Sequence, residues 1–254
     1  MKTHLLSIIA FTLLFVSCKD APSENQVIED KPEIEKGSLE DIIEQHIEGN
    51  LQIPATEDYS FKIHKEHLDG DDKMDAIITV NRLQFALNEA AKSDNSAKRA
   101  EFGFMGNYNY IFFYDGGLDK ISPQIAIPST PQAELKVSFE HVSSSAYKDI
   151  LIDFRVRNAS YKDFYTVSNH TPRRIFQWKN FDGLGNKINE AYTFKIEEGA
   201  VGLQKDILVM KANIVQPTEK VDLFTFEPEL KESNELVHRF FYNDQMGKYV
   251  TLKK

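Results

Sequence analysis

One short segment concentrates the residues whose chemistry is most specific. It is HLDGDDKMDAIITV, residues 67–80, in which four aspartates precede an apolar run typical of a strand. Calcium is bound by about six to eight oxygen atoms, and a turn with carboxylates at alternate residues can direct them to one centre. Gly70 permits such a turn. The predicted calcium ligands are Asp69, Asp71 and Asp75, with Asp72 and His67 as candidate additions. The alternative is a solvated acidic turn without an ion.

The order of residues in this segment resembles the calcium loop of FG-GAP or VCBS-type repeats. In that family, alternating acidic and glycine residues precede an apolar strand, and the repeats form the blades of a β-propeller. Two positions depart from the pattern, because His67 occupies the first ligand position and Asp72 replaces the second glycine. The resemblance implies a calcium site, and loss of the first carboxylate would weaken calcium binding.

No catalytic motif is recognisable elsewhere in the sequence. The chain lacks the nucleophile motif GxSxG, the zinc motif HExxH and a phosphate-binding loop. His64 and His67 could form a transition-metal site with Asp69, although histidines at a strand end and a turn are common without metal. A pair of catalytic carboxylates depends on proximity in space and has no sequence signature.

Aromatic residues are abundant in the segment 107–114. Alternation along a strand would direct Tyr108, Tyr110, Phe112 and Tyr114 to one face and Ile111 and Phe113 to the other. Apolar side chains on both faces favour a central strand. An exposed tyrosine face that stacks on sugars is the alternative. Trp178, the one tryptophan, is similarly predicted to lie in the core.

The N-terminus indicates export. Residues 1–17 have a basic start and an apolar run too short for a comfortable membrane span, and Cys18, the only cysteine, follows directly. This segment resembles the lipobox of bacterial lipoproteins, with Phe15 in place of the usual leucine. The resemblance implies a signal peptide over 1–17 and a lipid on Cys18. Lys19 and Asp20 resemble the export signals of Bacteroidota surface lipoproteins, which implies the outer membrane or cell surface, or alternatively a periplasm-facing anchor.

The formal net charge of −9 at pH 7 argues against one class of partner. Nucleic-acid binding requires a basic patch, and lysines and arginines are scattered along this chain. We therefore expect the membrane as a partner, through the lipid, and an envelope protein or glycan, but no nucleic acid.

The remaining pattern predicts a polar tether over 18–37 and a single β-rich domain over 38–254. An amphipathic helix is predicted at 38–49, with Ser38 as its N-cap, and a helical insertion within 82–100. Short runs rich in β-branched and aromatic residues, separated by Gly, Pro, Asn and Asp, predict twelve strands: 59–64, 76–81, 108–114, 124–128, 134–141, 150–157, 164–168, 174–178, 191–197, 206–214, 236–242 and 249–252. The predicted fold is mainly β, propeller-like or sandwich-like.

Three predicted strands begin alike, at Asp75, Asp149 and Asp206, each followed by an apolar run. Repeated blades are one explanation, and a common turn ending is the other. From these observations we predict a lipid-anchored envelope protein with a non-catalytic binding or assembly role. An envelope hydrolase that acts on glycan or peptidoglycan is the alternative.

Overall fold

The computed structural model describes residues 37–94, 106–200 and 202–251. The chain divides into two units, Met1–Gly37 and Ser38–Lys254, and the second contains all helices and strands of the described residues. These elements confirm the mainly β prediction, with two antiparallel sheets and two helices. Cys18 and the predicted signal peptide lie outside the described residues.

The first sheet has five strands in the order β1-β2-β3-β4, with β5 also paired to β3. Its strands are β1 (Ser60–Glu66), β2 (Asp75–Asn81), β3 (Asn109–Asp115), β4 (Lys120–Ile121) and β5 (Ile125–Ile127). β3 is central, as its aromatic pattern predicted: Ile111 and Phe113 pack on one face and Phe112 on the other. Tyr110 and Tyr114 belong to the cluster that packs with helix α1, so this face is not an open sugar platform.

The second sheet has eight strands in chain order. They are β6 (Lys136–Glu140), β7 (Asp149–Val156), β8 (Ala159–Ser168), β9 (Thr171–Asp182), β10 (Glu190–Glu197), β11 (Asp206–Ile214), β12 (Leu230–Asn243) and β13 (Lys248–Val250). β9 and β10 are paired only where Asp182 and Phe181 meet Glu190 and Ala191. The sheet bends there, so that β6–β9 faces β10–β13.

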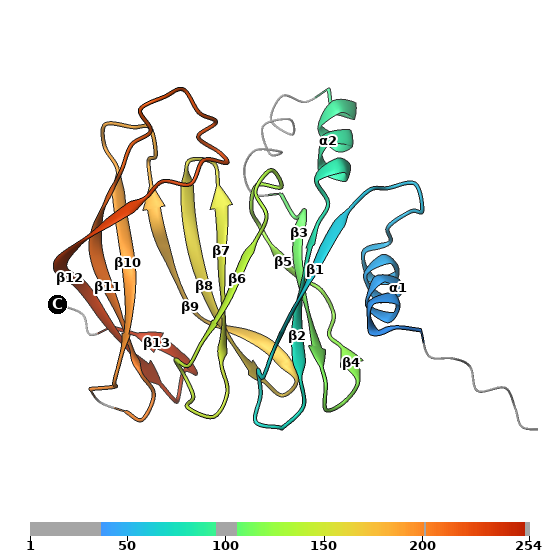
Figure 1. Cartoon of the computed structure of the whole chain (residues 1–254), viewed down its shortest axis with the longest axis horizontal. Helices are drawn as coiled ribbons and strands as arrows, with labels where there is room; N and C mark the ends of the chain where they lie inside the picture. Colours follow the sequence, from blue (N-terminus) through green and yellow to red (C-terminus); the bar gives the residue numbers. More distant parts are fainter. Residues whose placement is uncertain (1–36, 95–105, 201, 252–254) are drawn as a thin grey trace, which may run out of the picture. The chain divides into compact units, whose positions relative to one another are not determined.

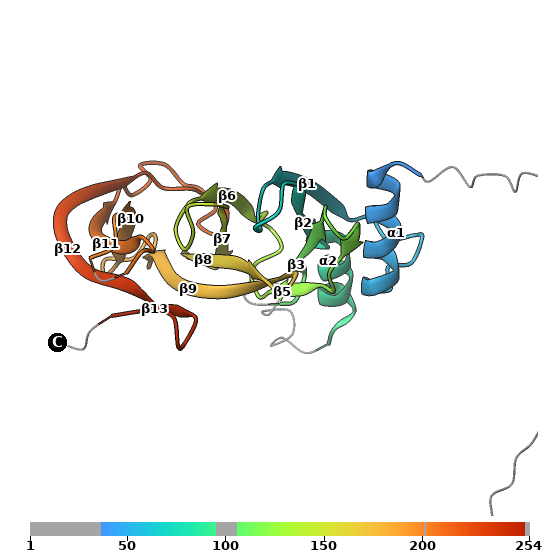
Figure 2. The same ribbon diagram turned by 90° about the horizontal axis from the view of Figure 1, so that it is seen from below.

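Three layers follow one another along the long axis of the domain: the first sheet, then β6–β9, then β10–β13 (Figures 1 and 2). Ile150 and Ile152 of β7 pack against the first sheet, whereas Leu151 points to the opposite face and packs with β10–β13. Successive residues of a strand point to opposite faces, so a layer covered on both sides needs a continuous apolar run. Phe176 of β9 contacts Phe240 of β12 with ring centroids 4.9 Å apart.

Helix α1 (Leu39–Leu51) covers the outer face of the first sheet. Ser38 is its N-cap, as predicted, and Asp41 completes a capping box with it. Ile43 and Ile47 are fully buried against the sheet. The helix continues two residues beyond its predicted end at 49, since Leu51 also packs into this cluster.

Helix α2 (Leu83–Lys92) confirms that the insertion begins as a helix. Arg82, immediately before it, forms a bidentate ion pair with Glu57, and both side chains are more than nine-tenths buried. This ion pair connects α2 to the segment between α1 and β1.

The three strands with similar starts belong to three similar hairpins. Asp75, Asp149 and Asp206 open the second strand of hairpins β1–β2, β6–β7 and β10–β11, and each is paired with a glutamate. The loops span 67–74, 141–148 and 198–205, eight residues each. All three aspartates are buried and accept a backbone N–H from their own loop. The three loops lie along one end of the domain (Figure 1), and backbone hydrogen bonds from Lys148 to His67 and from Lys205 to Val142 connect them.

Candidate functional site

The three predicted calcium ligands lie together in the first of these loops. One carboxylate oxygen from each of Asp69, Asp71 and Asp75 lies within 4.8 Å of the others. Calcium holds its oxygen ligands at about 2.3–2.6 Å, so ligands on opposite sides of one ion are about 5 Å apart. The three oxygens are therefore close enough to share a cation.

Backbone amides fix these carboxylates in the absence of an ion. Asp69 Oδ1 accepts the N–H of Asp71 at 2.9 Å, and Asp71 Oδ1 accepts the N–H of Lys73 at 2.7 Å. Asp75 accepts the N–H groups of Leu68 and Gly116, both at 3.0 Å. The second contact connects the loop to the turn after β3.

Two residues absent from the prediction extend the cluster. Asp115, at the end of β3, and His170, in the β8–β9 turn, each place a ligand atom within 4.8 Å of one from Asp69. His170 Nδ1 lies 2.5 Å from Asp115 Oδ2. A Cβ atom at Gly117 would lie 2.0 Å from Asp71 Oδ2, so a larger residue there would displace the Asp71 side chain. Three segments distant in sequence thus meet at the acidic loop.

The negative charges of the loop act on its buried member, Asp75. Burial raises the pKa of Asp75, the negative charges of Asp69 and Asp71 raise it further, and the two amide donors act in the opposite direction. A divalent cation would offset this repulsion. Asp149 and Asp206 occupy the equivalent position in the other hairpins, although the loop before Asp149 has no acidic residue and the loop before Asp206 has only Glu198. The position of Asp75 is therefore explained by the hairpin itself.

The other candidate ligands lie apart from this centre. His67 Nδ1 is 2.8 Å from the carbonyl oxygen of Lys73, where it closes the loop. The Asp72 side chain is 92% exposed and lies 3.9 Å from the Lys73 ammonium group. His64 contacts the Thr79 hydroxyl at 3.3 Å, within the first sheet. The structure therefore does not bring His64, His67 and Asp69 together as a transition-metal site would require.

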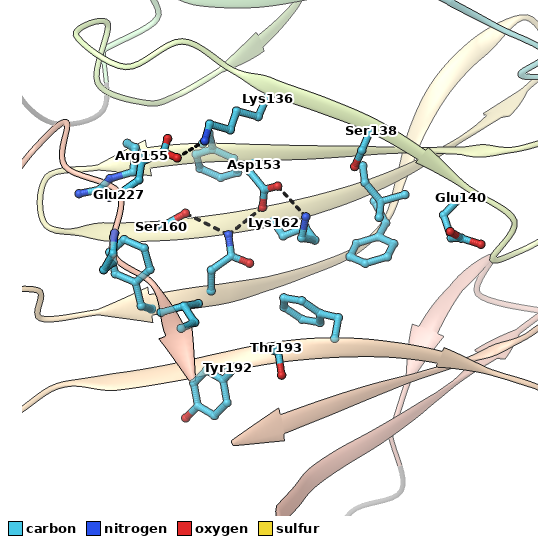
Figure 3. A pocket seen from close by; sticks show the side chains of 18 of the residues that line it. Lys136, Ser138, Glu140, Asp153, Arg155, Ser160, Lys162, Tyr192, Thr193 and Glu227 are labelled. Carbon is cyan, nitrogen blue, oxygen red and sulfur yellow. Dashed lines mark hydrogen bonds and ion pairs between the residues drawn. The ribbon is translucent and has the colours of Figure 1, made fainter. Parts of the chain in front are cut away.

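A groove of about 530 Å³ lies between β6 and β10, with β7, β8 and β9 as its floor. Lys136, Ser138 and Glu140 lie along one side and Tyr192 and Thr193 along the other (Figure 3). Apolar side chains from three strands line much of its surface: Leu151, Phe164, Phe194 and Ile196.

Several charged groups that line the groove are paired with one another. Asp153 lies 2.6 Å from the Lys162 ammonium group and accepts the Asn180 side-chain amide at 2.7 Å (Figure 3). Lys136 pairs with Glu227 across the end of the groove. Arg155 also lines the groove, and its guanidinium donates to the backbone carbonyls of Phe226 and Leu223.

Hydrolysis of a glycan requires two carboxyl groups that flank the scissile bond. Of the carboxylates that line the groove, Asp153, Glu227 and Glu134 are each engaged by a lysine. Glu140 is the one lining carboxylate without a partner among the described residues. Among the described residues, three of the four carboxylates that line the groove are therefore engaged by lysines.

No protein-family model matches this chain, and no curated protein or solved structure is detectably similar to it.

Within the described part of the chain, no helix has the length and apolar character needed to cross a membrane. Sequence reasoning missed the groove, because its lining comes from β6, β7, β8, β9 and β10. It also missed Asp115 and His170. The segment DGGLD, residues 115–119, offered a signal for the first of these, since acid and glycine again follow a strand.

Proposed function

We propose that the protein is a non-catalytic binding protein of a bacterial cell envelope, anchored by a lipid on Cys18, and that the groove between β6 and β10 is its binding surface. The observation that carries the proposal is the composition of the groove. Apolar and aromatic side chains line it, together with two pairs of opposite charges. Ligand sites commonly combine an apolar lining with a few fixed polar groups. The anchor is supported by the resemblance of the N-terminus to a lipobox, with the outer membrane or cell surface as the expected location.

Blocking the groove tests this proposal. Ser138 is exposed on β6 and lines the groove, so Ser138→Trp places an indole in it. We expect this variant to bind groove ligands at least about ten-fold more weakly, a loss near 1.4 kcal/mol. The measurement is fluorescence anisotropy of the full-length protein in detergent, with two labelled probe sets: soluble peptidoglycan fragments and nine-residue peptides.

The matched control is Ser145→Trp, an exposed position in the loop of the same hairpin. It should bind like the wild type. Equal binding by Ser138→Trp and wild type would exclude the groove as the binding surface. Cleavage of either probe set that is lost in Glu140→Gln would overturn the non-catalytic assignment.

We further propose that the acidic loop binds a calcium ion with a structural role. Support comes from the convergence of Asp69, Asp71 and Asp75 and from the repulsion that a cation would offset. The ion would stabilise the contact between this loop and the turn after β3, since Asp75 connects the two through Gly116.

Calcium should raise the stability of the wild-type protein. A loop with few ligands would have a dissociation constant on the order of 10⁻⁴–10⁻³ M. At ten times that concentration, the expected stabilisation is about 1.4 kcal/mol, measured as a calcium-dependent shift in the melting temperature. Asp71→Asn keeps an acceptor for the Lys73 N–H and removes one charge, and it should lose most of the shift. Asp72→Ala, whose side chain faces solvent, should retain it. A wild-type protein that shows no shift would exclude the calcium site.

A further inference from the structure

The strand β10 has an edge that is only partly used. Its residues 191–197 pair with β11 along their whole length. On its other edge, β10 pairs with β9 only at Glu190 and Ala191. From Tyr192 to Glu197, no backbone group of the described residues pairs with this edge.

The unpaired edge of β10 borders the groove. Tyr192, Thr193, Phe194 and Ile196 all line it, and the groove begins where β9 and β10 separate. Figure 3 shows β10 along one side and the side chains of β6 along the other, with the floor between them. The groove therefore combines a row of free backbone donors and acceptors with an apolar floor.

This combination matches an extended polypeptide better than a sugar chain. A strand added to a free edge satisfies its backbone groups in regular register and directs alternate side chains to one face. A sugar chain can stack on aromatic rings but offers no such register of amide groups. Next to β10, the inward side chains of an added strand would lie beside Phe194 and Ile196 and above Leu151 and Phe164, which form one apolar region of the groove.

The charges of the groove indicate one further feature of such a ligand. The charges of Lys136, Asp153 and Lys162 are already paired. Arg155, at the end of the groove, donates to the carbonyls of Phe226 and Leu223. Glu140, exposed on β6 across from β10, has no partner among the described residues. A lysine or arginine at the end of the ligand would complement this carboxylate.

We propose that the groove binds an extended peptide segment of another protein, which pairs with the free edge of β10, places apolar side chains at alternate positions on the groove floor and presents a basic residue to Glu140. This inference rests on the proposed function, because it names the ligand of the same groove. The protein's role would then be to bind extended segments of other proteins in the envelope.

The test uses a library of nine-residue peptides with lysine at both ends and apolar residues alternating with threonine. The tightest binder is then made in two N-methylated forms, one methylated at the apolar residues and one at the threonines. Only alternate amides of a strand face its neighbour, so we expect one form to bind at least about ten-fold more weakly and the other to bind like the parent peptide. Neither form alters the protein, so folding does not affect the comparison.

A charge exchange tests the role of Glu140. Glu140→Lys should weaken binding of the lysine-ended peptide, and a glutamate-ended version of that peptide should recover it. Equal binding by the parent and both methylated forms would overturn strand pairing. Binding of peptidoglycan fragments that Ser138→Trp blocks, without binding of any peptide, would overturn the peptide assignment and leave the proposed function intact. Absence of binding by both probe sets would overturn the proposed function itself.

Discussion

We expect Glu57→Ala to lower the free energy of unfolding by about 3–5 kcal/mol, because it leaves a buried guanidinium without its counter-charge. Arg82 Nε and Nη2 donate to the two Glu57 oxygens, both at 2.6 Å. The two side chains are only 8% and 6% exposed. In the variant, Arg82 keeps neutral partners such as the Leu51 carbonyl at 3.3 Å, which cannot replace a carboxylate. Urea denaturation followed by circular dichroism measures the effect.

Two further variants separate burial from charge pairing. Glu134 pairs with Lys62 on the surface, where the side chains are 57% and 58% exposed, and Glu134→Ala should cost less than about 1 kcal/mol. The double variant Glu57→Leu with Arg82→Met should recover much of the loss, since it removes the buried charge as well as its partner. If Glu57→Ala costs no more than Glu134→Ala, the pair does not stabilise the fold.

The positions of most strands could be predicted from the sequence because short runs of β-branched and aromatic residues are separated by turn residues. The ends of some strands could not. β8 begins at Ala159, five residues before its predicted start at 164. Lys162 and Asp163 lie in this part, and their partners are on neighbouring strands, Asp153 on β7 and Gln177 on β9. Such cross-strand pairs stabilise a strand without leaving an apolar pattern in its own sequence.

The three similar strand starts match over only five residues, which could not distinguish repeated blades from a common turn ending. The structure shows why the three are alike. Glu66, Glu140 and Glu197 each pair with the aspartate nine residues later, so the similarity includes the whole hairpin. This constant separation was available in the sequence. The burial of the aspartates was not, because charged residues are seldom buried without a partner.

Some residues of the candidate site could likewise be predicted from the sequence, and others could not. Asp69, Asp71 and Asp75 could be predicted because one short loop positions all three. Asp115 and His170 could not, since their proximity depends on packing between the first sheet and the β8–β9 turn. The Glu57–Arg82 pair is equally non-local, and no sequence period relates its two residues.

The hairpin aspartates lead to the second large effect, which we expect for Asp149→Ala. Asp149 is fully buried and accepts hydrogen bonds from the N–H groups of Val142 and Ser143 and from the Ser143 hydroxyl. Its removal leaves two loop amides without an acceptor, at about 1–3 kcal/mol for each buried group. The expected loss at pH 7 is therefore about 2–6 kcal/mol in urea denaturation. Glu140→Ala, the exposed register partner, should change stability by less than about 0.5 kcal/mol.

The pH dependence of this loss distinguishes a buried carboxylate from a merely bulky side chain. Burial raises the pKa of Asp149 above its ordinary value of 3.8, and hydrogen bonds from Ser143, Thr166 and Val142 oppose the shift. Between 3.8 and the raised pKa, the folded protein binds more protons than the unfolded chain, so the free energy of unfolding falls as the pH rises through this interval. The difference in stability between wild type and Asp149→Ala should therefore grow as the pH is lowered from 7 towards 3.8. A difference that stays constant over this range would contradict a raised pKa, and a difference that shrinks would show that the hydrogen bonds outweigh burial.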